Sequence, residues 1–220
     1  MSIALRQRDG CPPVVVQVWG PGALFTRPES KVERLTYPVM TPSAAVGVLE
    51  AIFWKPEFRW DVAAIEVLRP IRFGSVRRNE TDQVIGQDAA LRGLVVNTAS
   101  ARTQRAAIHL VDVGYRIHAH VSLHSHANEP AAKYRDQFRR RVSRGASFTT
   151  PYLGTREFGA FFGPPDDQAP VSLTEELGLM LHSIVFDASG RNPVSRWFDA
   201  RLEGGVMHVP GLDDPAKVYQ

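Results

Sequence analysis

The sequence lacks the features that mark disulfide-bonded, secreted or membrane-spanning proteins. Cys11 is the only cysteine in 220 residues, which excludes an intramolecular disulfide and a cysteine-based zinc site. The opening residues MSIALRQRDG have no apolar core and predict no secretory signal. No apolar run approaches the roughly 20 residues needed to cross a bilayer. The simplest expected location is the cytoplasm.

Strong net charge, internal repeats and low-complexity tracts are also missing. The formal net charge is +3, so the chain is only mildly basic. A hydrophobic content of 44% and a charged content of 22% predict a packed core rather than disorder. The basic residues nevertheless gather in a few segments, and this distribution favours an anionic partner.

The N-terminal part predicts a strand, a basic loop and a helix. Val14, Val16 and Val18 alternate with Val15 and Gln17, as in a half-buried strand, and Gly20–Gly22 are expected to break this strand. Thr41 is the expected N-cap of a helix whose first residue is Pro42. We expect the helix to end before Pro56, after Lys55, and to bury Ala45, Val48, Leu49 and Ile52.

The middle of the chain predicts one strand, one long connection and a second strand. Residues 62–73 form the first strand, in which Pro70 indicates an edge or a bend. Residues 74–107 are polar and basic and are long for a loop, so they should carry function, be mobile or contain a short helix. Residues 108–123 alternate most clearly, with apolar side chains on one face. The other face carries Asp112, Arg116, His118, His120, Ser122 and His124.

A second helix is predicted over residues 129–144, with Pro130 near its start and Gly145 as its C-terminal cap. Tyr134, Phe138 and Val142 lie four residues apart and form its buried stripe. The exposed face is strongly basic, which favours phosphate binding. Its central stripe consists of Lys133, Arg140 and Arg144.

This order of elements predicts an α+β protein. Residues 1–163 are compatible with a ferredoxin-like domain of the kind that RNA-recognition modules use. The proline-rich segment 163–170 resembles a linker, and residues 164–220 are expected to form a small antiparallel β-sheet appendage. In this appendage, residues 179–187 predict a strand and Gly204-Gly205 a hairpin turn.

Several long words of the sequence resemble one family. They read VWGPGALFTRPESKVERLTYPVMTPSAA, EAIFWKP, VLRPIRF and PYLGTREF. On these words the chain resembles the Cas five family of CRISPR-associated proteins, in the subtype d branch of type I-C systems. The resemblance implies a ferredoxin-like domain followed by a small β-sheet domain. It also implies cleavage of CRISPR repeat RNA without a metal or other cofactor.

The resemblance implies three catalytic positions, and this chain departs from two of them. Family members use a tyrosine in the word IFWKP and a Lys-His pair at the start of the second helix. Here these positions hold Phe53, Lys133 and Tyr134. Phe53 has no hydroxyl and is expected to pack or to stack on a base. His126, just before the helix, is a substitute base.

The expected reaction explains why a lysine, a tyrosine or a histidine would be useful at these positions. The 2′-hydroxyl of RNA attacks the adjacent phosphate, leaving a 2′,3′-cyclic phosphate and a 5′-hydroxyl. The site must align the attack, remove the 2′ proton and protonate the departing 5′ oxygen. Lys133 can neutralise the charged phosphorane. Tyr134 can donate a proton or a hydrogen bond, because a tyrosine is mostly protonated at neutral pH.

Basic residues outside the second helix are also expected to contact the RNA. Gly20, Gly22 and Gly154 could let the backbone approach a phosphate, or they could simply turn the chain. The predicted partners are the repeat RNA, the 5′ handle of the guide RNA, and the backbone and large subunits of the type I-C interference complex, with DNA left open. The expected RNA contacts outside the second helix are Arg27, Lys31, Arg34, Arg77 and Arg78.

Two alternatives remain open from the sequence. The protein is a clamp that holds the handle without cutting, or a phosphodiesterase whose metal is held by histidines. His118 and His120 share a strand face with His124, and this face suits either a metal or plain exposure to solvent.

Overall fold

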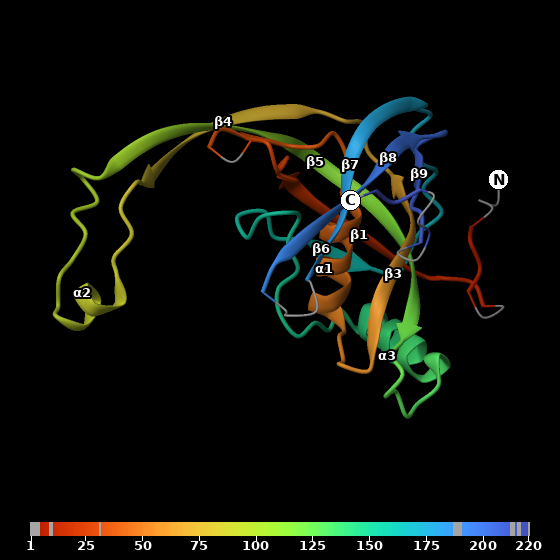
Figure 1. The fold of residues 1–220 in the computed structure, drawn as a ribbon. Helices are drawn as coiled ribbons and strands as arrows, with labels where there is room; N and C mark the ends of the chain where they lie inside the picture. The colour runs from red at the N-terminus through yellow and green to blue at the C-terminus, as the bar shows by residue number, and fades with distance from the viewer. Residues whose placement is uncertain are drawn as a thin grey trace.

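The fold of the computed structural model combines a seven-stranded sheet, a two-stranded sheet and helices packed against the larger sheet (Figure 1). The structure describes residues 5–8, 11–30, 32–186, 191–211, 214 and 217–219. Its elements are β1 (Val14–Ala23), β2 (Arg34–Leu35), α1 (Pro42–Ile52), β3 (Phe58–Val67), β4 (Phe73–Thr81), α2 (Gln87–Leu91), β5 (Arg102–Leu123), α3 (Ala131–Arg144), β6 (Phe161–Gly163), β7 (Glu175–Phe186), β8 (Pro193–Leu202) and β9 (Val206–His208).

The main sheet has the strand order β6-β1-β5-β3-β9, and β5 also pairs with β4 and, in parallel, with β2. All the other pairs are antiparallel. Val16 of β1 and Ile65 of β3 both lie opposite Ile117 of β5, so these three fully buried side chains share one face. Helices α1 and α3 cover that face. The predicted α+β class with a large and a small sheet is therefore confirmed.

Helix α1 begins as predicted. The Thr41 hydroxyl accepts a hydrogen bond from the backbone N–H of Ala44 at 3.3 Å, and Pro42 is the first helical residue. The helix ends at Ile52, three residues earlier than expected, because Phe53 is already extended and its carbonyl accepts a 2.9 Å hydrogen bond from the indole of Trp60. The predicted buried face is confirmed at Ala45, Val48, Leu49 and Ile52.

The predicted break of the first strand at Gly20–Gly22 is wrong. Strand β1 continues to Ala23, and Gly20 and Gly22 pair with Val113 and Val111 of β5. Pro21 is tolerated because β6 pairs only with residues 17–19 of β1, so the proline lies where β1 is an edge strand on that side.

The segment expected as a long connection, residues 74–107, forms an arm with a two-stranded base, in which residues 74–81 belong to β4 and residues 102–107 to β5. The strand predicted over residues 62–73 is two strands, β3 and β4, separated by residues 68–72, which contain Pro70. Strand β4 pairs with the first half of β5 from Phe73 to Thr81. The short helix α2 lies near the tip of this arm, which extends away from the body (Figure 1).

The polar face of β5 is buried, which corrects its expected exposure to solvent. His118 and His120 are 7% and 2% exposed. The N-terminal segment covers His120, whose ring bonds to the carbonyl of Arg6 at 2.7 Å. The segment after β6 covers Arg116, which donates to the carbonyls of Asp166 and Gln168. Both covering segments are distant in sequence, so the alternation within β5 could not reveal them.

Helix α3 confirms the second predicted helix. Gly145 caps it in the left-handed conformation, and Tyr134, Phe138 and Val142 form its buried stripe. The rings of Tyr134 and Phe138 contact Phe58 and Trp60 of β3. No helix within the described ranges is both long and apolar enough to span a membrane.

The C-terminal part shares a strand and a core with the rest of the chain. The turn at Gly204-Gly205 forms as predicted, with φ angles of 56° and 80°. After it, however, β9 pairs with β3 of the main sheet. Met180 of β7 and Phe198 of β8 belong to the same core as α1. The division at residue 163 stays a prediction, and this shared core indicates that the two parts fold against each other.

Gly154 supports the fold rather than approaching a phosphate, and it gives the first test. Its φ is +89°, and a Cβ there would lie 2.1 Å from the Leu24 carbonyl oxygen. We expect Gly154→Ala to lower the free energy of unfolding by about 2–4 kcal/mol. Gly159→Ala, where a Cβ meets nothing within 4 Å, should change it by less than about 0.5 kcal/mol. Urea unfolding measures both, and equal effects would contradict this reason for the glycine.

Candidate active site

Three segments meet at the end of the main sheet where β5 stops. They are residues 53–57 after α1, residues 124–130 after β5 and the first turn of α3. Backbone hydrogen bonding joins the first two, since the N–H of His124 donates to the carbonyl of Glu57 at 2.9 Å. The sequence-predicted positions Phe53, His126, Lys133 and Tyr134 all lie on these segments.

Tyr134 points into the core. It is 2% exposed, its ring centroid lies 5.1 Å from that of Phe58, and its hydroxyl has no hydrogen-bond partner in the described part of the chain. Burial, and after it the carboxylates of Glu57 and Glu129, raise the pKa of Tyr134, which Lys133 opposes only in part. The hydroxyl therefore stays protonated and does not reach the surface in this conformation.

Lys133 is half exposed and held by a carboxylate. Its Nζ lies 2.5 Å from an oxygen of Glu129, one helical turn earlier, and the two side chains are 49% and 45% exposed. A pair this exposed contributes little to stability, on the order of 0.3–0.5 kcal/mol. A phosphate can therefore displace Glu129 at small cost and bind the ammonium group.

His126 is exposed and its ring orientation is fixed. Its Nε2 lies 3.0 Å from the carbonyl oxygen of Pro56, and its ring stacks on that of His124 at 5.5 Å. A carbonyl only accepts, so Nε2 must donate. In neutral His126 the lone pair therefore sits on Nδ1, where it can take a proton.

Phe53 is part of the core. It is 2% exposed, and its ring lies 5.7 Å from Phe58 and 6.2 Å from Phe148. This burial supports the packing expected for Phe53 and argues against stacking on an RNA base. Phe148, by contrast, is 55% exposed and carries the guanidinium of Arg141 at 3.9 Å from its ring centroid.

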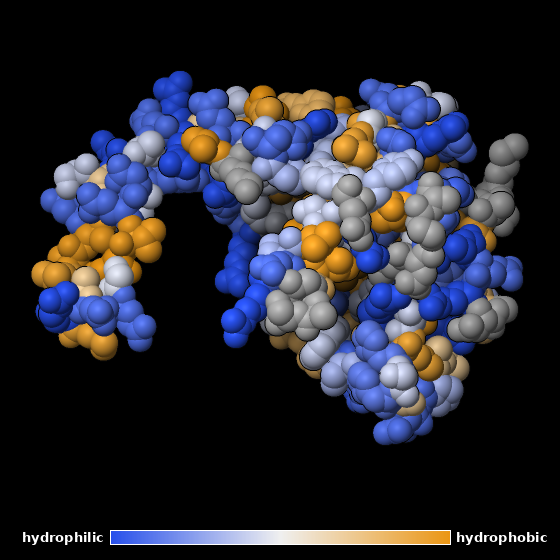
Figure 2. Space-filling model, in the orientation of Figure 1, coloured by the Kyte–Doolittle hydropathy of each residue, from blue (hydrophilic) through white to orange (hydrophobic). Residues whose placement is uncertain are grey.

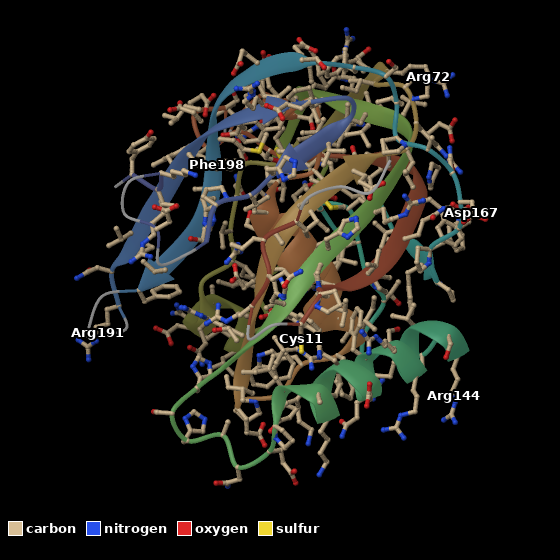
Figure 3. The ribbon with its side chains drawn as sticks, turned by 90° about the vertical axis from the view of Figure 1, so that its right-hand side faces the viewer. Cys11, Arg72, Arg144, Asp167, Arg191 and Phe198 are labelled. Atoms are coloured by element: carbon tan, nitrogen blue, oxygen red, sulfur yellow. The ribbon has the colours of Figure 1, made fainter. Side chains whose placement is uncertain are left out.

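The predicted RNA-binding residues fall into two separate groups. Arg140 and Arg144 are exposed on α3, and Figure 3 shows Arg144 extending outward from the end of that helix. The second group lies on the chain around β2 and on β4 at the base of the arm. There Arg78 binds Glu80 and Glu157 at 3.0 and 2.7 Å. The other members of this group are Arg27, over the ring of Tyr37, Arg34, 3.5 Å from Glu80, and the exposed Arg77. Lys31 lies outside the described residues.

The histidine face of β5 is engaged by protein groups. His118 Nε2 lies 2.5 Å from a carboxylate oxygen of Glu66, which also binds Arg116 at 2.5 Å. Within the described ranges, no three or more His, Cys, Asp or Glu side chains are grouped to hold a metal ion. His118 and His120 are therefore held by buried hydrogen bonds to protein groups, whereas His124 is exposed and stacks on His126.

Sequence reasoning missed three neighbours of the site. Glu129 precedes Lys133 by four residues, so helical spacing alone could have suggested this pair. Glu57 approaches Tyr134 only through the pairing of β3 with β5, and the Arg141–Phe148 contact joins two distant segments. No pattern in the neighbouring sequence predicts the approach of Glu57 to Tyr134 or the Arg141–Phe148 contact.

The matching family model identifies the class of protein. It is described as CRISPR-associated protein (Cas_Cas5), subtype Cas5d, and it matches residues 14–213. The chain belongs to this family of CRISPR-associated proteins.

Two curated relatives are similar over most of the chain. The CRISPR pre-crRNA endoribonuclease Cas5d of Thermus thermophilus is 44% identical over 212 residues, covering 89% of this chain and 90% of the relative. The protein of the same name from Mannheimia succiniciproducens is 42% identical over 213 residues, covering 89% and 93%.

Solved structures confirm the fold. A crystal structure of a CRISPR-associated protein superposes with a TM-score of 0.67 at 22% identity, covering 94% of this chain and 95% of that one. A functionally uncharacterised protein of Streptococcus mutans superposes with a TM-score of 0.66 at 19% identity, covering 94% and 96%.

The buried hydroxyl of Tyr134 gives a test of its role. Since it has no partner in the described part of the chain, Tyr134→Phe should leave the free energy of unfolding unchanged or raise it by about 1 kcal/mol. Tyr115→Phe is the matched control, because the Tyr115 hydroxyl is hydrogen-bonded to the backbone of Met40 and its loss should cost about 1 kcal/mol. A clear loss of stability in Tyr134→Phe would contradict an unpartnered hydroxyl.

Proposed function

We propose that this chain is an endoribonuclease that cuts the repeats of CRISPR precursor RNA. The observation that carries the proposal is its 44% and 42% identity, over most of its length, to two relatives named as pre-crRNA endoribonucleases. The exposed Lys133 and His126, which both lie on the segments that meet at the end of β5, are consistent with that activity.

The RNA-binding part has a ferredoxin-like fold. This is supported by the four strands β1, β3, β5 and β6, which lie in the order β6-β1-β5-β3 when the side strands β2 and β4 are set aside. Helix α1 follows the first of these strands and α3 follows the third. A β-α-β-β-α-β succession in one antiparallel sheet is the plan of this fold, which RNA-recognition modules share.

In the proposed reaction the 2′-hydroxyl attacks the adjacent phosphate without a metal. The O2′–P bond forms as the P–O5′ bond breaks, and the departing 5′ oxygen takes a proton from water, which leaves a 2′,3′-cyclic phosphate and a 5′-hydroxyl. His126 accepts the 2′ proton at Nδ1, since Nε2 is held by Pro56. Lys133 exchanges Glu129 for the phosphate and stabilises the charge of the phosphorane. Tyr134 positions Lys133 by anchoring the first turn of α3 in the core, and does not act as a base.

A non-catalytic clamp is the second candidate. Two observations favour it: Phe53 stands where the family has a hydroxyl, and the hydroxyl of Tyr134 is buried. In that role the chain would hold the 5′ handle of the guide RNA while another nuclease makes the cut.

Both candidates place the chain in the cytoplasm as a subunit of the type I-C interference complex, beside its backbone and large subunits. Arg140 and Arg144 contact RNA phosphates, as do the arginines at the base of the arm. The arm supports the subunit role because its tip exposes apolar side chains at Val84, Leu91, Leu94 and Val95. Figure 2 shows this apolar tip separated from the body by open space.

Cleavage of the cognate repeat RNA should proceed in excess EDTA. A single 2′-deoxy nucleotide immediately 5′ of the scissile phosphate should stop cleavage and leave binding intact, because it removes the nucleophile. Gel electrophoresis of the products and filter binding check both expectations. Loss of activity in EDTA that a divalent ion restores would overturn the mechanism, and binding without any cutting would favour the clamp.

Lys133→Ala should slow single-turnover cleavage by about 10²-fold or more if the ammonium stabilises the transition state. His126→Ala should slow it by about 10²–10⁴-fold if the imidazole is the base. Arg139→Ala is the control, since this exposed residue lies on the same helix and pairs with Asp136. Rates at saturating protein separate chemistry from binding. If both variants cut at the wild-type rate, the catalytic groups lie elsewhere.

A further inference from the structure

An open groove lies beside the candidate site. It has a volume of about 870 Å³ and runs between the outer face of α1 and the segment from Phe148 to Gly159. The groove is built by helix termination: the Ala51 carbonyl, left free at the end of α1, accepts from the backbone N–H groups of Phe148 and Thr149 at 2.8 and 3.3 Å. This anchoring fixes one wall against the other.

Two glycines keep the groove open, although neither a close contact nor a positive φ requires glycine at these positions. Gly47 lies in the middle of α1 and Gly159 on the opposite wall, and a Cβ at either position would meet nothing within 4 Å. Neither has a positive φ. A glycine inside a helix lowers its stability by about 1 kcal/mol relative to alanine. The space that these glycines leave therefore suits a ligand that approaches α1 closely.

The groove offers flat rings and a cation. Trp54, Phe148 and Tyr152 line it and are 48%, 55% and 40% exposed. Arg156 lines it too, and within the described ranges its guanidinium makes no hydrogen bond or ion pair. Exposed aromatic rings beside a basic group are the combination that binds unpaired nucleotides, because each base can stack and each phosphate can pair.

The groove is continuous with the basic helix. Arg141 of α3 places its guanidinium 3.9 Å from the ring centroid of Phe148, at the end of the groove. An RNA strand that crosses the exposed face of α3 therefore meets the groove next.

We propose that this groove binds one unpaired nucleotide of the repeat RNA, next to the segment that is cut. The inference rests on the proposed function, because it takes RNA as the ligand. The base stacks on Trp54, and Arg156 binds its phosphate. Glu50 lies on the α1 wall, where its carboxylate repels phosphate and accepts from an amino group of the base. The base edge therefore faces α1.

The test uses repeat RNA with a 2′-deoxy block at the cut site and 2-aminopurine at one unpaired position at a time. Stacking should quench 2-aminopurine fluorescence at one position. Trp54→Ala and Gly47→Leu should restore the fluorescence at that position and raise the Kd for the repeat RNA by about five- to a hundredfold. Gly47→Leu fills the groove but should not lower Tm, because leucine is the better helix former.

Phe186→Ala is the matched control, since this residue is 63% exposed on β7 and does not line the groove; it should change neither signal. Absence of quenching at every position, or unchanged RNA affinity in both groove variants, overturns the proposal. The proposal is also overturned if Trp54→Ala keeps its RNA affinity but no longer assembles with partner subunits. That result would show that the groove binds a protein partner. Blocked RNA makes these outcomes independent of cleavage, which unmodified RNA measures separately.

Discussion

The bend of β5 at Asp112 is the constraint on which the rest of the molecule depends. Strand β5 pairs with β4 up to Leu110 and with β3 from Tyr115 onward, so it must change partners between these residues. Asp112 has a φ of 52°, which is costly for a residue with a side chain. Its carboxylate receives Arg69 and Arg72 from the β3–β4 connection, and these ion pairs hold the bend where the two partner strands separate.

That one strand sets the distance between the two ends of the molecule. A strand of 22 residues spans up to about 70 Å when fully extended. One end carries the arm, and the other delivers the loop with His126 and then α3 with Lys133. The candidate site and the arm thus lie at the two ends of one strand.

Sequence patterns correctly predicted the features that depend on interactions between residues close together in the chain. The Thr41 cap, the buried stripe of α3 and the valine alternation of β1 follow from spacing within a few residues, and all formed. The patterns failed where distant segments decide. Gly20–Gly22 looked like a break, but β5 continues to pair with them. The polar face of β5 suggested a metal site or exposure to solvent, but the N-terminal segment covers His120 and the 166–168 segment covers Arg116. At the site, spacing placed Lys133 and His126 near each other, but only the packing of β3 shows that Tyr134 points inward.

The aromatic cluster explains why Phe53 and Tyr134 do not face the surface at the candidate site. Phe53, Phe58 and Tyr134 pack ring against ring, so two of the three positions that the family resemblance assigns to catalysis are core positions here. A hydroxyl at position 53 would have to be buried or to open this cluster, and either costs free energy. The apolar ring at Phe53 instead locks α1 to α3 and supports Phe148 from below. The same packing therefore withdraws one hydroxyl from the site and holds the aromatic wall of the neighbouring groove in place. With Phe53 and Tyr134 in the core, Lys133 and His126 are the two predicted catalytic side chains that remain exposed.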